Sequence, residues 1–147
     1  MSRVALLDVN VLIALFDPDH VHHDPAHDWF EDNRRFGWAT CPLTENAIVR
    51  ILANPAYVAG AESTAQIVKR LRRFCGSGGH IFWGDTLSVR DRQRFPATFP
   101  VSTRQVTDSY LLALAVANDG TLATFDSSIA LATVVGATAT HLTLVSA

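Results

Sequence analysis

Four acidic residues stand at points where the folded chain could gather them into one site. Asp8 and Asp126 directly follow apolar runs that end at Leu7 and Phe125. Glu45 in PLTENAIVRIL and Asp108 in QVTDSYLLALA each fall in the first turn of an expected helix. A metal-dependent phosphodiesterase needs several carboxylates from different elements, because Mg²⁺ and Mn²⁺ bind oxygen ligands. The joint pattern therefore predicts a hydrolase site for a hard cation.

Each of these acids also has a purely structural interpretation. Asp8 and Asp126 are suited to cap a following helix, and an acid in a first turn favours the helix dipole. For Glu45 taken alone, the dipole is the better explanation. Asp8 is harder to explain in this way, because LLDVNVLIAL is very apolar and an unpaired carboxylate is costly there. Asn10, two residues later, is a second cap or a partner that orients Asp8.

The order of strands and helices decides whether the four acids can meet. The apolar periodicity predicts strands at residues 3–7, 37–41, 80–83, 121–125 and 141–145. It predicts helices at 9–16, 25–36 (opened by Pro25), 42–52, 61–74 and 103–118, and a short helix with a proline-containing loop within 84–100. This alternation predicts one three-layer α/β domain over residues 1–147, with a mostly parallel sheet and the site at the carboxyl ends of its strands.

Composition and charge limit the class of protein. Hydrophobic residues make up 48% of the 147 residues, which is typical of a globular domain and excludes a disordered chain. A net charge of −2 means that overall charge does not hold a nucleic acid. The uncharged run at residues 9–16 is too short to span a membrane, and no signal-peptide pattern precedes it. We therefore expect a cytoplasmic protein with no membrane contact and with free thiols at Cys41 and Cys75.

Basic and histidine residues form three further groups. The best candidates for RNA contact are Arg90, Arg92, Arg94 and Arg104 in the least regular region, with Arg50 expected to pair with an acid near the pocket. The helix at 61–74 should turn Ile67, Val68, Leu71 and Phe74 inward and Lys69, Arg70, Arg72 and Arg73 mostly outward, as a solvated face or as a contact surface for a nucleic acid or a protein partner. The third group is His20, His22, His23 and His27, for which packing and capping are a better explanation than zinc, because supporting ligands are missing.

The order of four segments along the chain resembles a known family. LLDVNVLIAL, LTENAIVRIL, VTDSYLLALA and LATFD resemble, in this order, the motifs of the PIN-domain nucleases. More narrowly, the chain is similar to the VapC-type toxins of bacterial toxin–antitoxin pairs, over residues 4 to about 145. The block DVNVLIALFDPDHVHHDPAHDWF is especially similar to one VapC subgroup.

The resemblance implies a PIN-like fold with about five strands and a role for each acid. Asp8 and Asp108 would be the direct ligands of Mg²⁺ or Mn²⁺. Glu45 and Asp126 would complete the acidic pocket, the latter through water. The polar side chains that the family places beside these acids correspond to Asn10 and Thr124.

The same resemblance implies an activity and two kinds of partner. The activity would be endoribonuclease hydrolysis that leaves 5′-phosphate and 3′-hydroxyl ends. The partners would be a second copy of the chain in a homodimer and a small VapB-like antitoxin that inserts a C-terminal segment into the pocket. Transfer, ribosomal and messenger RNA all stay open as substrates, because specificity would lie in loop shape and stacked single-stranded bases.

Two rival functions stay open beside the ribonuclease. The first is a catalytically idle PIN-fold module that holds an antitoxin or operator DNA, against which the complete set of acids argues. The second is a metal-dependent DNase of the flap type, although such proteins usually carry an added helical clamp, for which 147 residues leave no room.

Overall fold

A sheet of parallel strands forms the centre of the protein. The computed structural model describes residues 3–58, 61–97 and 102–146. Within these ranges the strands are β1 (Ala5–Leu7), β2 (Trp38–Thr40), β3 (His80–Phe82), β4 (Thr121–Thr124) and β5 (Leu142–Leu144). They lie in the order β3-β2-β1-β4-β5, and every neighbouring pair is parallel. This arrangement confirms the predicted α/β class with a parallel sheet.

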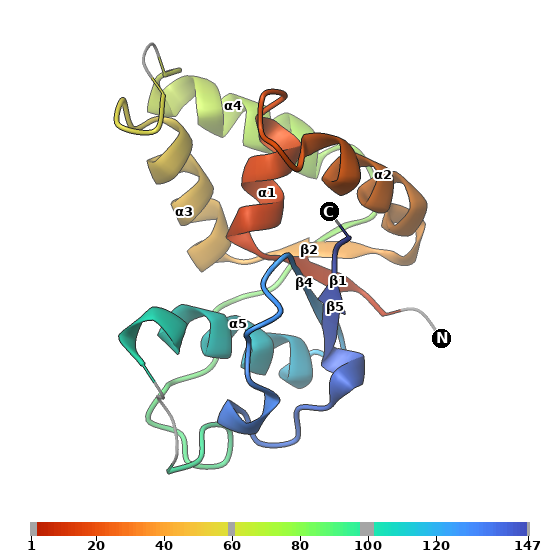
Figure 1. Cartoon of the computed structure of the whole chain (residues 1–147), viewed down its shortest axis with the longest axis vertical. Helices are drawn as coiled ribbons and strands as arrows, with labels where there is room; N and C mark the ends of the chain where they lie inside the picture. The colour runs from red at the N-terminus through yellow and green to blue at the C-terminus, as the bar shows by residue number, and fades with distance from the viewer. Residues whose placement is uncertain (1–2, 59–60, 98–101, 147) are drawn as a thin grey trace.

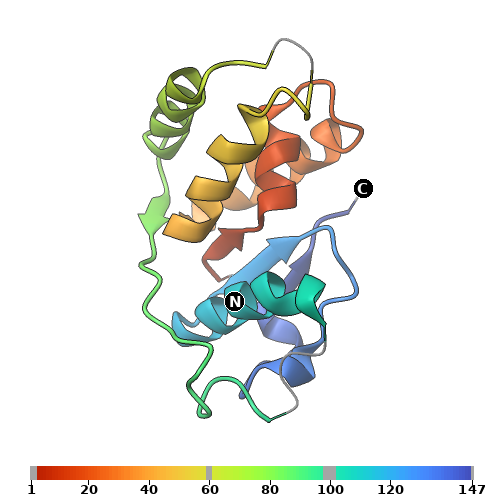
Figure 2. The same cartoon turned by 90° about the vertical axis from the view of Figure 1, so that its left-hand side faces the viewer.

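Helices cover both faces of the sheet and make the other two layers (Figure 1). One face carries α1 (Val9–Phe16), α2 (His23–Asn33), α3 (Pro42–Leu52) and α4 (Thr64–Cys75), and the other carries α5 (Val106–Ala117). Figure 2 shows the same two helical layers from the side. In the described part of the chain, no helix is long and apolar enough to cross a membrane.

Alternate residues of the strands face the two helical layers. In β1, Ala5 and Leu7 belong to the core beneath α1–α4, whereas Leu6 belongs to the core beneath α5. In β4, Leu122 faces α5 and Ala123 faces the other layer. Because both faces are buried, the strands appear in the sequence as continuous apolar runs rather than as alternating ones.

The structure corrects three of the predicted helices. α2 begins at His23 rather than at Pro25, because a proline fits a first turn, whose N–H groups have no partner within the helix. α4 begins at Thr64 rather than at residue 61, because Ser63 forms a capping box with Gln66. The short helix expected within 84–100 is absent from residues 84–97, where turns close around Asp91, and residues 98–100 lie outside the described part.

The last long helix differs from the prediction mainly at its start, and it ends at Ala117, one residue before the predicted end. Thr103–Gln105 form a 3-10 turn, and the α-helix proper begins at Val106. This start places Asp108 in the first turn of α5, as the sequence suggested.

The strand order creates a switch point between β1 and β4. From β1 the chain continues through β2 to β3 on one side, and it returns to build β4 and β5 on the other side. The N–H of Asp8 donates to the carbonyl of Ala123 at 2.9 Å, which ties the carboxyl end of β1 to that of β4. In open parallel sheets this crevice is where ligands bind.

Candidate active site

Asp8 is a nearly buried carboxylate at the switch point, with 5% of its surface exposed. Its Oδ1 accepts a hydrogen bond of 2.7 Å from the N–H of Val9, which confirms that Asp8 caps α1. Its Oδ2 accepts a second bond of 2.7 Å from the hydroxyl of Thr124. Burial raises the pKa of Asp8 against the lowering effect of these two bonds, and the charge of Asp126 raises it further. Capping therefore accounts for one of its oxygens only.

The fully buried hydroxyl of Thr124 links the polar residues of the site. It donates to Asp8, and it accepts from the Nδ2 of Asn10 at 3.2 Å and from the N–H of Asp126 at 3.1 Å. The Oδ1 of Asn10 faces the N–H of Phe125 at 3.5 Å. Thr124 thus holds Asp8 in one orientation and joins the first turn of α1 to the end of β4.

Asp108 and Asp126 bring two further carboxylates to the same crevice. Burial, followed by the charges of Asp8 and Asp126, raises the pKa of Asp108 from its ordinary 3.8 to about 6. The pKa of Asp126 is lowered, because its Oδ1 accepts from the hydroxyl and the N–H of Ser128 at 2.6 and 2.8 Å. The sequence had left Ser128 without a role. The structure therefore brings three of the four predicted acids close enough to repel one another.

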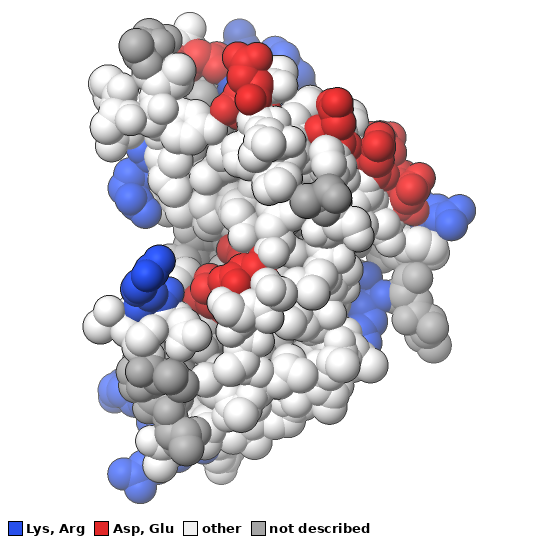
Figure 3. Space-filling view, in the orientation of Figure 1, with Lys and Arg blue, Asp and Glu red and all other residues white. Residues whose placement is uncertain are grey.

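An open polar cavity of about 440 Å³ gives access to two of these acids, Asp108 and Asp126. Arg104 and Ser128 line the same cavity. Figure 3 shows acidic side chains in a hollow at mid-height of the molecule, with basic side chains beside it. A pocket lined by two carboxylates and a guanidinium suits a metal ion together with an anionic substrate.

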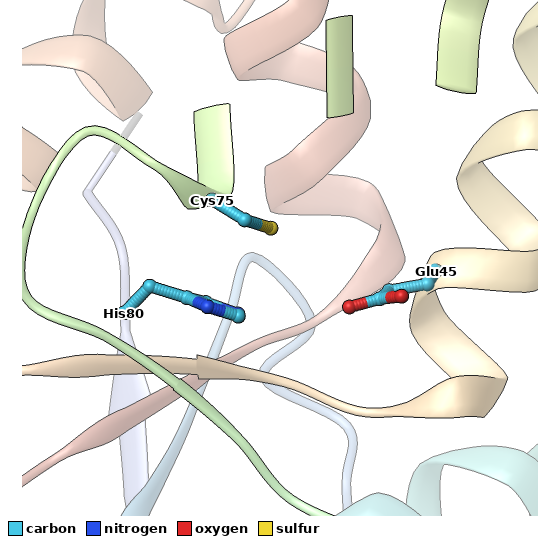
Figure 4. A group of neighbouring side chains, drawn as sticks. All are labelled: Glu45, Cys75 and His80. Atoms are coloured by element: carbon cyan, nitrogen blue, oxygen red, sulfur yellow. The ribbon is translucent and has the colours of Figure 1, made fainter. Parts of the chain in front are cut away.

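Glu45 lies at the end of the neighbouring strand and makes different contacts. It belongs to the first turn of α3, as predicted, and its Oε2 accepts a hydrogen bond of 2.6 Å from Thr40. Glu45 is not among the acids whose charges raise the pKa of Asp108, which are Asp8 and Asp126. Its carboxylate faces Cys75 and His80 instead (Figure 4). The structure thus places Glu45 at the same edge of the sheet as the three aspartates, but with its carboxylate turned toward β3.

Sequence reasoning missed the environment of Glu45. The Nε2 of His80 lies 2.7 Å from the hydroxyl of Thr40, and its ring packs 4.8 Å from that of Trp38. Burial lowers the pKa of His80 and raises that of the Cys75 thiol. Only the parallel pairing of β2 with β3 brings these residues together, because no short spacing in the sequence marks them.

The predicted basic residues occupy different surfaces. Arg104 lines the acidic cavity, whereas Arg50 lines a groove of about 720 Å³ between α3 and α4 together with Glu45. The expected pairing of Arg50 with an acid is wrong within the described chain, because the exposed Arg50 forms no ion pair there. Val68 also lines this groove and is 37% exposed, so the prediction that it faces inward is wrong. As candidates for RNA contact, Arg90, Arg92 and Arg94 stay predictions.

Arg70 of the basic run on α4 and His23 of the histidine group make structural contacts. Arg70 pairs with Glu62 at 2.6 Å and stacks over Phe16, whose carbonyl accepts another of its hydrogen bonds. His23 bonds the carbonyl of Ala14 at 2.7 Å, and its ring neighbours that of His27. Among the described residues, the histidines at 20–27 belong to no group of three possible metal ligands. Packing and local hydrogen bonds are the contacts that the structure gives this group, whereas the predicted capping is not confirmed for His22, whose side chain makes no cap bond to α2.

Comparison with known proteins now defines the class. The PIN domain family matches residues 5–134, which include every strand but β5 and all the acids described above. The chain is thus a PIN domain, and its five-stranded parallel sheet carries the acidic crevice at the switch point.

Individual relatives define the family within this class. Ribonuclease VapC44 of Mycobacterium tuberculosis is 47% identical over 138 residues, or 94% of this chain and 96% of that protein. Ribonuclease VapC29 of the same species is 44% identical over 125 residues (85% and 87%), and Ribonuclease VapC38 is 41% identical over 126 residues (86% and 87%). The chain therefore belongs to the VapC family of PIN-domain ribonucleases.

Proposed function

We propose that this protein is a metal-dependent endoribonuclease that hydrolyses RNA phosphodiester bonds to 5′-phosphate and 3′-hydroxyl ends. The observation that carries this proposal is the convergence of Asp8, Asp108 and Asp126 at the switch point. Burial, and after it the charges of Asp8 and Asp126, raises the pKa of Asp108 to about 6. Folding tolerates such a cluster at a cost in stability, which is a common feature of functional sites.

The donor set fits Mg²⁺ or Mn²⁺. Every side chain at the crevice that could bind a cation offers an oxygen, and hard divalent ions select oxygen ligands. Asp8 and Asp108 would hold the ion directly, with Asp126 acting through water and Glu45 completing the pocket. When bound, such an ion activates water and neutralises charge on the phosphate.

The polar residues around the acids act as positioning groups. Thr124, whose hydroxyl accepts a hydrogen bond from Asn10, fixes the Oδ2 of Asp8, so this carboxylate needs little reorganisation before it binds a cation. Ser128 holds Asp126 in its ionised form by two hydrogen bonds. Arg104, which lines the cavity, would attract the RNA backbone.

Family membership supports the proposed biological context. We propose that the chain acts as the toxin of a toxin–antitoxin pair, is neutralised by a VapB-like antitoxin and forms a homodimer. A cytoplasmic location stays a prediction from the sequence.

The test is cleavage of total RNA, and in parallel of DNA, by antitoxin-free protein with Mg²⁺, with Mn²⁺ and with a chelator. We compare the wild type with Asp8→Asn and with Asp28→Asn, which changes an exposed aspartate on α2. Metal-dependent fragments with 5′-phosphate ends from the wild type and Asp28→Asn, but not from Asp8→Asn, support the proposal. Equal cleavage by Asp8→Asn refutes it, cleavage of DNA alone favours the DNase, and no cleavage by any protein favours the idle binding module.

A further inference from the structure

A second group of possible metal ligands lies beside the acidic pocket and has a different chemistry. Glu45 comes from α3, Cys75 is the last residue of α4, and His80 is the first residue of β3. One ligand atom from each lies within 4.8 Å of the other two. Figure 4 shows the three side chains pointing toward a common centre. In the described part of the chain this is the only such group of three.

From this geometry we propose that Glu45, Cys75 and His80 form a binding site for one Zn²⁺ ion. Thiolate, imidazole and carboxylate are zinc ligands, and three of them plus a water complete a tetrahedral shell. Zinc distances of about 2.0–2.3 Å place such ligand atoms roughly 3.3–3.6 Å apart. In the structure the ligand atoms lie within 4.8 Å of one another, so side-chain rotations that move them by about an ångström bring them to zinc-binding distances.

The surroundings of the three ligands favour a preformed site. All three residues are half-buried, so an ion can enter from solvent and is still partly shielded. The imidazole of His80 packs against the fully buried ring of Trp38, which restricts its rotation. The single hydroxyl proton of Thr40 is donated to Glu45, so His80 must donate its Nε2 proton to Thr40 in the metal-free state. Zinc binding at Nε2 would replace this Thr40 bridge between Glu45 and His80.

Zinc in this site would also act on the ribonuclease, a consequence that rests on the proposed function. Glu45 is the one side chain common to the zinc group and to the proposed Mg²⁺ pocket. A Zn²⁺ ion bound to Cys75 and His80 holds the Glu45 carboxylate toward β3 and away from the acidic crevice. We therefore expect Zn²⁺ to inhibit RNA cleavage even when Mg²⁺ is saturating.

The binding test uses the full chain with Mg²⁺ in excess, so that the acidic crevice does not take up the probe ions. Zn²⁺ affinity is measured by competition with a chromophoric chelator, and Co²⁺ is added as a spectroscopic substitute. Cys41→Ser is the control for the second thiol, because serine is favoured at the N-cap position that Cys41 occupies. If this variant does not fold, Cys41→Ala replaces it. His27→Gln is the control for a histidine outside the group.

The expected result is one Zn²⁺ per chain in the wild type and in both controls. Cys75→Ser and His80→Gln should each lower zinc affinity by at least about 100-fold, since even the loss of an outer-shell partner costs roughly 10- to 100-fold. Cobalt should give a thiolate charge-transfer absorption that Cys75→Ser abolishes. If Cys75→Ser binds zinc as tightly as Cys41→Ser, the site is refuted, whether or not the protein cleaves RNA.

The inhibition test separates this inference from the proposed function. Zinc should inhibit Cys41→Ser as it inhibits the wild type, and Cys75→Ser should need at least about 100-fold more zinc for the same inhibition. Equal inhibition of both variants shows that zinc acts elsewhere and refutes the link through Glu45. If no variant cleaves RNA under any condition, the proposed function fails, while the binding test still decides the zinc site.

Discussion

Replacing Asp108 by asparagine should make the metal-free protein more stable while it abolishes RNA cleavage. The rise of the Asp108 pKa from 3.8 to about 6 corresponds to about 3 kcal/mol in favour of the neutral form, at about 1.4 kcal/mol per pKa unit. Solvent reaches this half-buried carboxyl, so we reduce the expected gain in unfolding free energy to about 1–2 kcal/mol. Among the described residues no hydrogen bond depends on the Asp108 carboxylate, so asparagine loses no such bond.

The sign of this effect determines its dependence on pH. The folded pKa of Asp108 lies above the unfolded one, so the folded state holds more protons between about pH 3.8 and 6. The wild type should therefore lose stability relative to Asp108→Asn as pH rises through this window. The two proteins should be equally stable below about pH 3.8, and their difference should be constant above pH 6.

The assay is thermal and urea unfolding of both proteins in chelator at several pH values, with Asp28→Asn as the control. At pH 7.5 the midpoint of Asp108→Asn should be about 3–8 °C higher than that of the wild type. Mg²⁺ at ten times its dissociation constant adds about 1.4 kcal/mol to the wild type alone and should remove most of the difference. A destabilised Asp108→Asn at pH 7.5, or a gain that persists at low pH, would show that burial and the neighbouring carboxylates do not penalise the charge of Asp108.

Three further predictions follow from the same contacts. Thr124→Val should cost about 1–3 kcal/mol of unfolding free energy, because it leaves the Oδ2 of Asp8 and the N–H of Asp126 without their partner. Urea unfolding measures this loss, and a change below about 0.5 kcal/mol would contradict the role of Thr124. Mg²⁺ affinity, measured by calorimetry, should rise as pH rises through about 6, because Asp108 must lose its proton to bind the ion; an affinity that is flat between pH 5 and 7 would contradict this. Arg104→Ala should weaken RNA binding in a filter-binding assay and reduce its salt dependence by about one phosphate contact. Arg35→Ala, on the 3-10 turn after α2, should leave both quantities unchanged. If RNA affinity falls equally steeply with salt in the wild type and in Arg104→Ala, Arg104 does not contact the RNA.

Much of the fold could be predicted from local patterns. The apolar run before Asp8 and the proline at residue 42 marked β1 and the start of α3, since burial and capping act over a few residues. Helix starts were less predictable wherever two signals competed, as at Pro25 against His23. The turn-rich segment at 84–97 gave a misleading helical pattern, because its Asp91 closes turns with the following backbone.

The sequence by itself determined which residues are acidic, where strands and helices place them, and that the chain resembles one nuclease family. Only the tertiary structure decided which acids meet. The pairing of β1 with β4 brings together Asp8, Thr124 and Asp126 across more than a hundred residues. The pairing of β2 with β3 turns Glu45 toward His80. Repulsion and ligand geometry act over a few ångströms in space, and only strand pairing sets distances of that kind between residues so far apart in the chain.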